Sequence, residues 1–177
     1  MPADEVRGRP ILLYGDRRLR RHCRSFDPGD PDAAQLADEL WARLAGDGVG
    51  LAAPQIGADR RLIVIDDPRK VGRKPLVLVN PTVERTIGPL EPFEEGCLSF
   101  PGLYLMIRRR RSVRLRYFDL AGRPHRLADN GLLARIVQHE IDHLDGILFC
   151  DRLPRAGRWL LSMRLWWLAR WHWRYRR

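Results

Sequence analysis

The sequence lacks any uninterrupted apolar stretch of the roughly 20 residues that a membrane-spanning helix requires. It also lacks a secretory leader, because the acidic N-terminus is followed only by a short apolar run at residues 11–14. Cysteine is scarce, and Cys23, Cys97 and Cys150 form an odd number without the spacing of a disulfide framework. These absences exclude a disulfide scaffold and predict a cytoplasmic protein.

Acidic residues are missing from the C-terminal end of the chain. All 22 Asp and Glu residues lie at or before Asp151, whereas the segment from Arg152 to Arg177 contains eight arginines and no acid. The formal net charge of the whole chain is +10, so most of the excess positive charge lies in this segment. Such an asymmetry favours a polyanionic partner or an anionic membrane surface for the C-terminus.

What is present is the composition of an ordinary globular domain, with 177 residues, 45% of them hydrophobic and 31% charged. Apolar residues recur at helical spacing over residues 31–45 and 132–144. Short β-rich runs at residues 62–65 and 76–79, and an alternating apolar and basic pattern at 112–118, predict strands. Because these elements do not alternate as regular βαβ units, the sequence favours an α+β fold.

The second predicted helix carries the sequence His139-Glu140-Ile141-Asp142-His143. Residues four apart lie on one face of a helix, so His139 and His143 can direct their rings to one point with Glu140 beside them. Two imidazoles bind a first-row divalent ion, and the carboxylate can take a proton from water. The alternative is a solvated helix with two incidental histidines.

A catalytic ion of this kind needs a third protein ligand and an open position. Four residues downstream of the histidine pair offer ligand atoms, namely Asp145, Cys150, Asp151 and His172. Upstream, Cys97 lies in a segment bounded by glycine and proline, predicted to be a loop, and its thiol either binds the metal or is a small buried hydrophobic group. Spacing alone does not choose between these candidates.

A third cluster is the small-residue segment at residues 48–55, with the sequence GVGLAAPQ. Its two glycines permit backbone conformations or close approaches that a side chain forbids, and Gln55 adds an amide donor and acceptor. It is not a phosphate-binding loop, because the Lys-Ser/Thr ending is absent. The residues alone favour a helix-to-strand turn with Gln55 at the surface.

Taken together, GVGLAAPQ, EGCLSFPG and QHEIDHLDG resemble, in this order, the three signature motifs of the peptide deformylase family. The resemblance covers most of the chain, from about Arg9 to Leu153. It implies a compact single α+β domain with mixed or antiparallel sheets packed around the central HExxH helix, and a C-terminal helix. The expected organisation is a deformylase-like catalytic domain at residues 1–153 and a basic, Trp-rich appended helix at 154–177.

The resemblance also implies roles for individual residues. Three correspond to the family's metal ligands: Cys97, His139 and His143. Glu140 corresponds to the general acid/base, and Gln55 corresponds to the side chain that binds the oxyanion together with the backbone N–H of Leu98. Arg109 matches a structural family arginine that pairs with a carboxylate such as Asp142, whereas the exposed arginines around it are interpreted as a solvated face.

The resemblance further implies a substrate pocket that selects methionine. Its six expected residues are Val49, Gly50, Glu95, Tyr104, Leu132 and Ile136. Leu132 and Ile136 share the helix face of the two histidines, which supports their placement, although both can equally be ordinary core residues. Tyr104 stands where some relatives have an arginine, so contacts with the peptide beyond methionine are expected to differ.

The implied activity is metal-dependent hydrolysis of the formyl group of N-terminal formyl-methionine on new polypeptides. The family's cofactor is one divalent ion, Fe(II) in the cell, with zinc, nickel or cobalt as replacements in purified protein. A thiolate ligand makes such a site softer than one built from two histidines and a carboxylate. Two alternatives are a zincin-like metallopeptidase that uses only the HEIDH segment and an inactive docking module with the same fold.

The C-terminal segment holds five of the six tryptophans among its arginines. In bacterial relatives a C-terminal helix docks on the ribosome, and a basic helix fits ribosomal RNA because it neutralises phosphates. The rival hypothesis is a helix at an anionic membrane surface, with tryptophans at the headgroups. A third hypothesis is that the tryptophans cover the hydrophobic core and that the arginines only keep the segment soluble. No DNA partner is expected.

Overall fold

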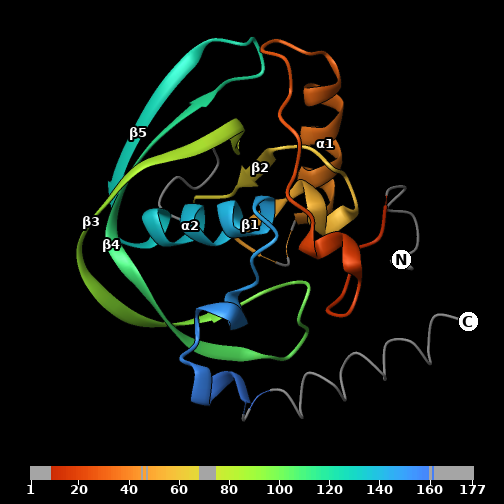
Figure 1. Cartoon of the computed structure of the whole chain (residues 1–177). Helices are drawn as coiled ribbons and strands as arrows, with labels where there is room; N and C mark the ends of the chain where they lie inside the picture. Colours follow the sequence, from red (N-terminus) through yellow and green to blue (C-terminus); the bar gives the residue numbers. More distant parts are fainter. Residues whose placement is uncertain (1–8, 45, 47, 68–74, 160, 162–177) are drawn as a thin grey trace, which may run out of the picture.

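The structure is a computed structural model that describes residues 9–44, 46, 48–67, 75–159 and 161 (Figure 1). Within these residues the helices, 3₁₀ helices and strands follow one another in this order: η1 (Arg17–Arg20), α1 (Asp32–Leu44), β1 (Gly50–Ala52), η2 (Ala53–Ile56), β2 (Leu62–Ile65), β3 (Leu76–Gly96), β4 (Tyr104–Phe118), β5 (Pro124–Asn130), α2 (Leu132–Leu144) and η3 (Phe149–Arg152).

The strands form one five-stranded sheet in the order β1-β2-β3-β4-β5, and each neighbouring pair is antiparallel. The sheet curves around α2, which runs through the centre of the view, with the long strands β3 and β4 on one side (Figure 1). Helix α1 lies on the other side of the short strands β1 and β2. The predicted α+β class and the central position of the HExxH helix are confirmed.

Strand β2 shows why its sequence is an unbroken apolar run. Leu62 and Val64 pack with the buried face of α1, whereas Ile63 and Ile65 pack with α2. Side chains alternate between the two faces of a strand, so a strand covered on both faces needs apolar residues at every position. All four residues of β2 are accordingly buried.

Helix α2 is buried on almost every side. Its central residues Ile136 and Val137 lie in the apolar cluster formed with β1, β2 and β4. The same helix buries His139, Glu140, Asp142 and His143. Ionisable groups inside a core need partners, since burial of an unpaired charge is costly. His139 and Asp142 have such partners in Glu95 and Arg109, whereas Glu140 Oε2 and His143 Nδ1 have none among the described residues.

The structure differs from the sequence predictions at the ends of several elements. Strand β3 continues far beyond residue 79 to Gly96, so Glu94 and Glu95, which precede Cys97 in the segment predicted to be a loop, are strand residues. Beyond its short pairing with β2, β3 has β4 as its neighbour on one side only. Prolines are tolerated where a strand has a free edge, which explains why the proline-containing sequence remains extended. The segment predicted to be a turn contains strand β1, and Gln55 is buried rather than exposed.

Residues 155–159 are helical, as expected for the start of the C-terminal helix, and Leu161 is buried in a cluster with Phe100 and Phe149. The predicted helix beyond these positions lies outside the described residues. No helix in the described part of the chain has the length and apolar character needed to cross a bilayer.

Candidate metal and catalytic site

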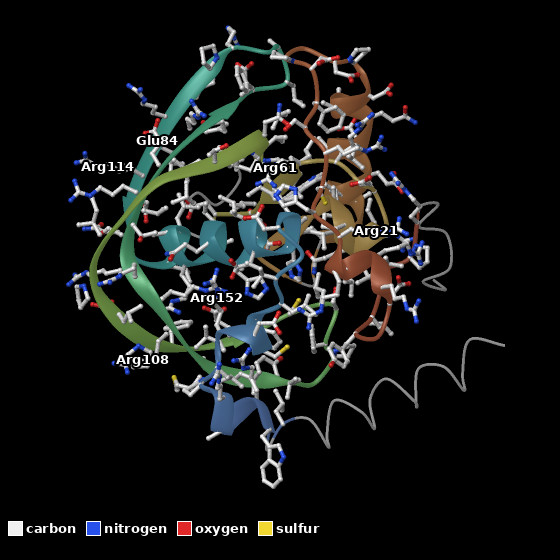
Figure 2. All side chains as sticks on the ribbon, viewed as in Figure 1. Arg21, Arg61, Glu84, Arg108, Arg114 and Arg152 are labelled. Carbon is white, nitrogen blue, oxygen red and sulfur yellow. The ribbon has the colours of Figure 1, made fainter. Side chains whose placement is uncertain are left out.

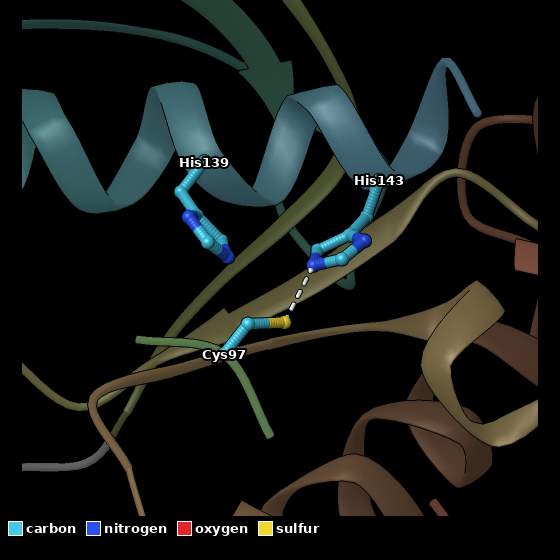
Figure 3. Close-up of side chains that lie close together, drawn as sticks. All are labelled: Cys97, His139 and His143. Carbon is cyan, nitrogen blue, oxygen red and sulfur yellow. Dashed lines mark hydrogen bonds between the residues drawn. The ribbon is translucent and has the colours of Figure 1, made fainter. Parts of the chain in front are cut away.

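Three side chains that could bind a metal meet at the centre of the molecule. His139 and His143 project from successive turns of α2, and Cys97 reaches them from the segment after β3 (Figure 3). One ligand atom from each residue lies within 4.8 Å of the other two, and Cys97 Sγ is 3.3 Å from His143 Nε2. A tetrahedral ion holds a sulfur at ~2.3 Å and an imidazole nitrogen at ~2.1 Å, which separates the two ligand atoms by about 3.5 Å. The spacing and the thiol-plus-imidazole donor set fit a divalent metal.

Other residues considered as the third ligand lie elsewhere or are already engaged. Asp145 forms an ion pair with Arg61 at 2.6 Å, and Asp151 is paired with Arg20. Cys150 is buried in the apolar cluster around Phe149. His172 lies outside the described residues. Cys97 is therefore the candidate that the structure brings to the two histidines.

The surroundings shift the pKa values of the two histidines in opposite directions. Burial lowers the pKa of His143 well below its usual value, and the positive charges of His139 and Arg109 act in the same direction. Burial also acts to lower the pKa of His139, but hydrogen bonds with Cys97 and Glu95 outweigh it and raise that pKa to about 10. His143 is thus a neutral ring, whereas a metal bound to His139 has to displace a proton.

Glu95 supports His139 from the side away from the sulfur. Its Oε2 lies 3.0 Å from His139 Nδ1, and its two oxygens accept hydrogen bonds from Arg109 at 2.8 and 3.0 Å. Arg135 donates a further bond of 2.8 Å to the same carboxylate. Burial alone raises the pKa of Glu95, but hydrogen bonds from His139 and Arg109 outweigh it and bring that pKa to about 2. An anionic carboxylate on the second ring nitrogen fixes the ring and leaves the other nitrogen for a metal.

Arg109 ties this carboxylate to the helix. Its Nη1 donates to Asp142 Oδ2 at 2.7 Å, and all three charged side chains of the group Glu95, Arg109 and Asp142 are buried. Arg152 also pairs with Asp142, from the segment after α2. The expected pairing of Arg109 with Asp142 is confirmed. The contact between Glu95 and His139 was missed, because nothing in the local sequence links residues 44 positions apart.

Glu140 lies beside the ligand group in an apolar setting. Its side chain is buried, and its Oε2 has no hydrogen-bond partner among the described residues. Burial raises the pKa of Glu140 to about 7, against the opposing effect of the charges of His139 and Arg109. A carboxyl group with a pKa near neutrality can both accept and return a proton, as a general acid/base requires.

Gly50 makes room for that carboxylate. A Cβ atom at Gly50 would lie 2.7 Å from Glu140 Oε1 and 2.9 Å from Ile136 Cγ2. Gly50 is in strand β1 and does not have a left-handed backbone, so the glycine is needed for close approach rather than for a turn. The small-residue motif thus shapes the site from the strand that faces α2.

Gln55 is fixed with its amide nitrogen toward the same group. Its Oε1 accepts a hydrogen bond of 2.8 Å from the backbone N–H of Ala52, which sets the orientation of the amide. Its Nε2 is then 3.5 Å from Cys97 Sγ and 3.3 Å from Ser99 Oγ. The backbone N–H of Leu98, next to Cys97, makes no hydrogen bond within the described part of the chain. Two N–H donors therefore lie close to the candidate metal position.

A cavity of about 410 Å³ adjoins these groups. Its lining includes Cys97, His139 and Glu140, as well as the two candidate oxyanion donors. All six residues predicted to bind substrate also line it: Val49, Gly50, Glu95, Tyr104, Leu132 and Ile136. Ile136 is buried, whereas Val49, Leu132 and Tyr104 are exposed at the opening. Glu95 directs its carboxylate to His139 and the arginines, and the Tyr104 ring covers Gly96.

A family model described as polypeptide deformylase matches residues 8–159. A peptide deformylase of Picosynechococcus sp. is 45% identical over 148 residues, which is 81% of this chain and 79% of that protein. Peptide deformylase 2 of Gloeobacter violaceus is 43% identical, with 86% of this chain and 84% of that protein covered. The crystal structure of a peptide deformylase from Synechococcus elongatus in complex with actinonin superposes with a TM-score of 0.81, at 42% identity and 90% coverage of both chains.

Proposed function

The chain belongs to the polypeptide deformylase family, and from this premise we propose how its residues carry out the reaction. The protein is a hydrolase that removes the formyl group from newly made polypeptides. Water adds to the formyl carbon, the C–N bond breaks, and formate and the free N-terminal amine are released. The observation that carries the residue assignment is the meeting of Cys97, His139 and His143 beside Glu140 at the cavity.

The three ligand candidates would hold one divalent ion. When bound, such an ion lowers the pKa of water from 15.7 toward ~7 and withdraws charge from the formyl oxygen. We propose Fe(II) as the ion in the cell, with zinc, nickel or cobalt accepted in purified protein. The mixed sulfur and imidazole donor set of Cys97 and the histidines supports a borderline-soft ion. Because Fe(II) and a thiolate are both oxidisable, activity is expected to be lost in air.

Glu140 would move the protons. Its carboxylate takes a proton from the attacking water and returns it to the leaving amine nitrogen, so that the group is restored at the end of each cycle. The pKa of about 7 supports both halves of this role at neutral pH. Its buried position supports it as well, since the proton is kept from bulk water.

Gln55 Nε2 and the backbone N–H of Leu98 would stabilise the charge that develops on the formyl oxygen. Both are donors next to Cys97, and the Gln55 amide is held in place by Ala52. Removal of one such donor typically lowers the rate by ~10²–10³-fold. Methionine would enter the cavity between Val49, Leu132 and Ile136, where apolar side chains can cover its thioether.

The assignment is tested by measuring formate release from a formyl-Met peptide under anaerobic conditions, with metal analysis of the same samples. Glu140→Gln is expected to keep its metal and to lose turnover by ~10²–10⁴-fold, because the proton carrier is gone while the ligands remain. Glu84→Gln makes the same change at an exposed glutamate of β3 that does not line the cavity; it is the matched control and should keep activity. Retained turnover in Glu140→Gln would contradict the assignment.

We also propose, from the charge of the chain alone, that the C-terminal segment docks on ribosomal RNA or on an anionic membrane surface and that the enzyme works in the cytoplasm. A chain that ends at Leu161 keeps the buried contact of that residue and removes five of the eight arginines of the segment. This shortened chain should bind ribosomes or anionic vesicles more weakly than the full chain does. The difference in affinity should be larger at low salt, where charges are screened less. Unchanged binding in both assays would refute this proposal.

A further inference from the structure

The outward side of the curved sheet carries a line of arginines. Val113 and Leu115 of β4 are buried against α2, and the alternating residues Arg114 and Arg116 are exposed on the opposite side. The outer arginine face is defined by six exposed residues of β3, β4 and β5: Arg85, Arg108, Arg110, Arg114, Arg116 and Arg126. Figure 2 shows Arg108 and Arg114 projecting from the sheet on the side away from α2.

The register places like charges opposite one another on this face. Arg85 is the cross-strand partner of Arg114, and Arg116 is the partner of Arg126. Paired residues on neighbouring strands point to the same side of a sheet, and like charges at such positions destabilise it. Folding stability therefore does not account for the arrangement.

Acidic side chains do not balance these charges. Glu84 lies 3.6 Å from Arg126, and Arg110 donates to the backbone oxygen of Gly88. Within the described residues the side chains of the other members of the face, Arg85, Arg108, Arg114 and Arg116, form no hydrogen bond or ion pair. Their guanidinium groups are free to bind an external anion.

We propose that the outer arginine face binds the phosphate backbone of folded RNA. From Arg108 to Arg116 the charges extend along nine residues of one strand, and the eight steps between these ends span about 26 Å at ~3.3 Å per residue. Arginine binds phosphate oxygens through two parallel N–H donors, and a row of such contacts gives sequence-independent affinity. The substrates of this enzyme are polypeptides in synthesis, which emerge from a particle built on RNA.

The outward positions between these arginines favour RNA over a lipid surface. Binding at a membrane interface depends on large apolar side chains that enter the headgroup region. Around Arg114 and Arg116 the outward positions are small or polar instead: Ser112 precedes Arg114 on this side of β4, and Ala128 and Thr82 lie opposite the two arginines. The exposed apolar residues Leu90 and Met106 lie beside Arg110 and Arg108, toward the other end of the face. None of the six arginines lines the cavity, so RNA bound here leaves the cavity open to substrate.

The test compares two double variants of the full-length, metal-loaded protein. Arg114→Gln with Arg116→Gln removes two charges from the outer arginine face. Arg17→Gln with Arg21→Gln removes two exposed charges elsewhere, and Arg21 lies on the opposite side of the molecule (Figure 2). Affinity for a labelled RNA hairpin is measured by fluorescence anisotropy over a series of salt concentrations. Binding to phosphatidylglycerol vesicles and formate release from a formyl-Met peptide are measured on the same samples.

The first double variant should bind the hairpin about tenfold more weakly than the wild type. The slope of the logarithm of its binding constant against the logarithm of the salt concentration should be smaller by about 1.4–1.8, the value for two phosphate contacts. Its formate release should be unchanged, and the Arg17 and Arg21 control should retain most of the RNA affinity. Equal weakening in both variants, no weakening in the first, or a loss of vesicle binding with RNA binding retained would overturn the proposal.

Discussion

The position of the Glu140 carboxylate depends on a residue without a side chain. Gly50 in β1 lies against Glu140 Oε1 and Ile136, and a methyl group there would come within 2.7 Å of the carboxylate oxygen. The carboxylate cannot remain where it is if this space is filled, because 2.7 Å is shorter than a carbon–oxygen van der Waals contact. Proton transfer depends on distance, so a small displacement should have a large effect on rate.

Gly50→Ala is therefore expected to lower kcat for formate release by about 10²-fold with the metal content unchanged. Gly48→Ala is the control, since its Cβ would meet only the side chains of Leu44 and Leu98, at 3.3 and 3.5 Å. Steady-state kinetics and metal analysis of both variants give the comparison. If Gly48→Ala lowered kcat as much as Gly50→Ala, the close approach to Glu140 would not be the cause.

The three thiols should differ in reactivity. Burial raises the pKa of Cys23 and of Cys150 to about 11, from an ordinary value of 9. Near pH 7 both are neutral in the folded and unfolded chain, and above about pH 9 only the unfolded thiols ionise, so these two groups reduce stability as the pH rises. Cys97 is only partly buried and faces the cavity.

We expect iodoacetamide at neutral pH to modify Cys97 in the folded, metal-free protein and to leave Cys23 and Cys150 unmodified. Metal should protect Cys97, and the unfolded chain should react at all three positions. Mass spectrometry of digested protein identifies the modified sites. Equal modification of Cys97 with and without metal would argue against its role as a ligand.

At the scale of elements, α2 and β4 are joined by a buried ionic group. Arg109 of β4 binds Asp142 of α2 and Glu95 of β3, and Glu95 in turn binds His139. Removing one partner from such a group leaves a buried charge with fewer partners. The stability lost is then larger than the net stability that the intact group contributes. The same contacts that orient the candidate metal ligand His139 therefore hold α2 against β3 and β4.

Arg109→Met should lower the free energy of unfolding by about 3 kcal/mol, because two buried carboxylates each lose one partner while Arg135 and Arg152 remain bound to them. The matched control is Arg108→Met, whose side chain is exposed on the outer face one residue earlier and should change stability by less than about 0.5 kcal/mol. Denaturant unfolding of the metal-free proteins measures both. Similar losses in the two variants would show that the buried ionic group contributes little.

The elements predicted from the sequence are those with a clear local period. The alternation of Val113, Leu115 and Tyr117 with arginines marked the inner and outer sides of β4, and the helical period marked α2 within its observed bounds. The extension of β3 was missed because Pro89 and Pro92 normally interrupt a strand, and only its free edge permits them there. The local sequence holds no signal for a partner on a distant strand.

At the scale of the whole molecule, the site is assembled from segments far apart in the chain. Strand β1 contributes Gly50, the segment after β3 contributes Cys97, and α2 contributes the histidines and Glu140. The motif resemblance predicted which residues belong together, whereas their distances follow only from the fold. The support of His139 by Glu95 and the opposed arginines on the outer face depend on strand register, which the sequence does not encode locally.

The central claim is that Cys97 completes the metal site with His139 and His143, and the metal content of cysteine variants tests it most directly. Wild-type protein, Cys97→Ala and the matched buried control Cys150→Ala are prepared anaerobically with Fe(II), and bound iron and formate release are measured together. We predict about one iron per chain with full activity in the wild type and in Cys150→Ala, and loss of both in Cys97→Ala. A Cys97→Ala protein that keeps its iron and still releases formate would contradict the account.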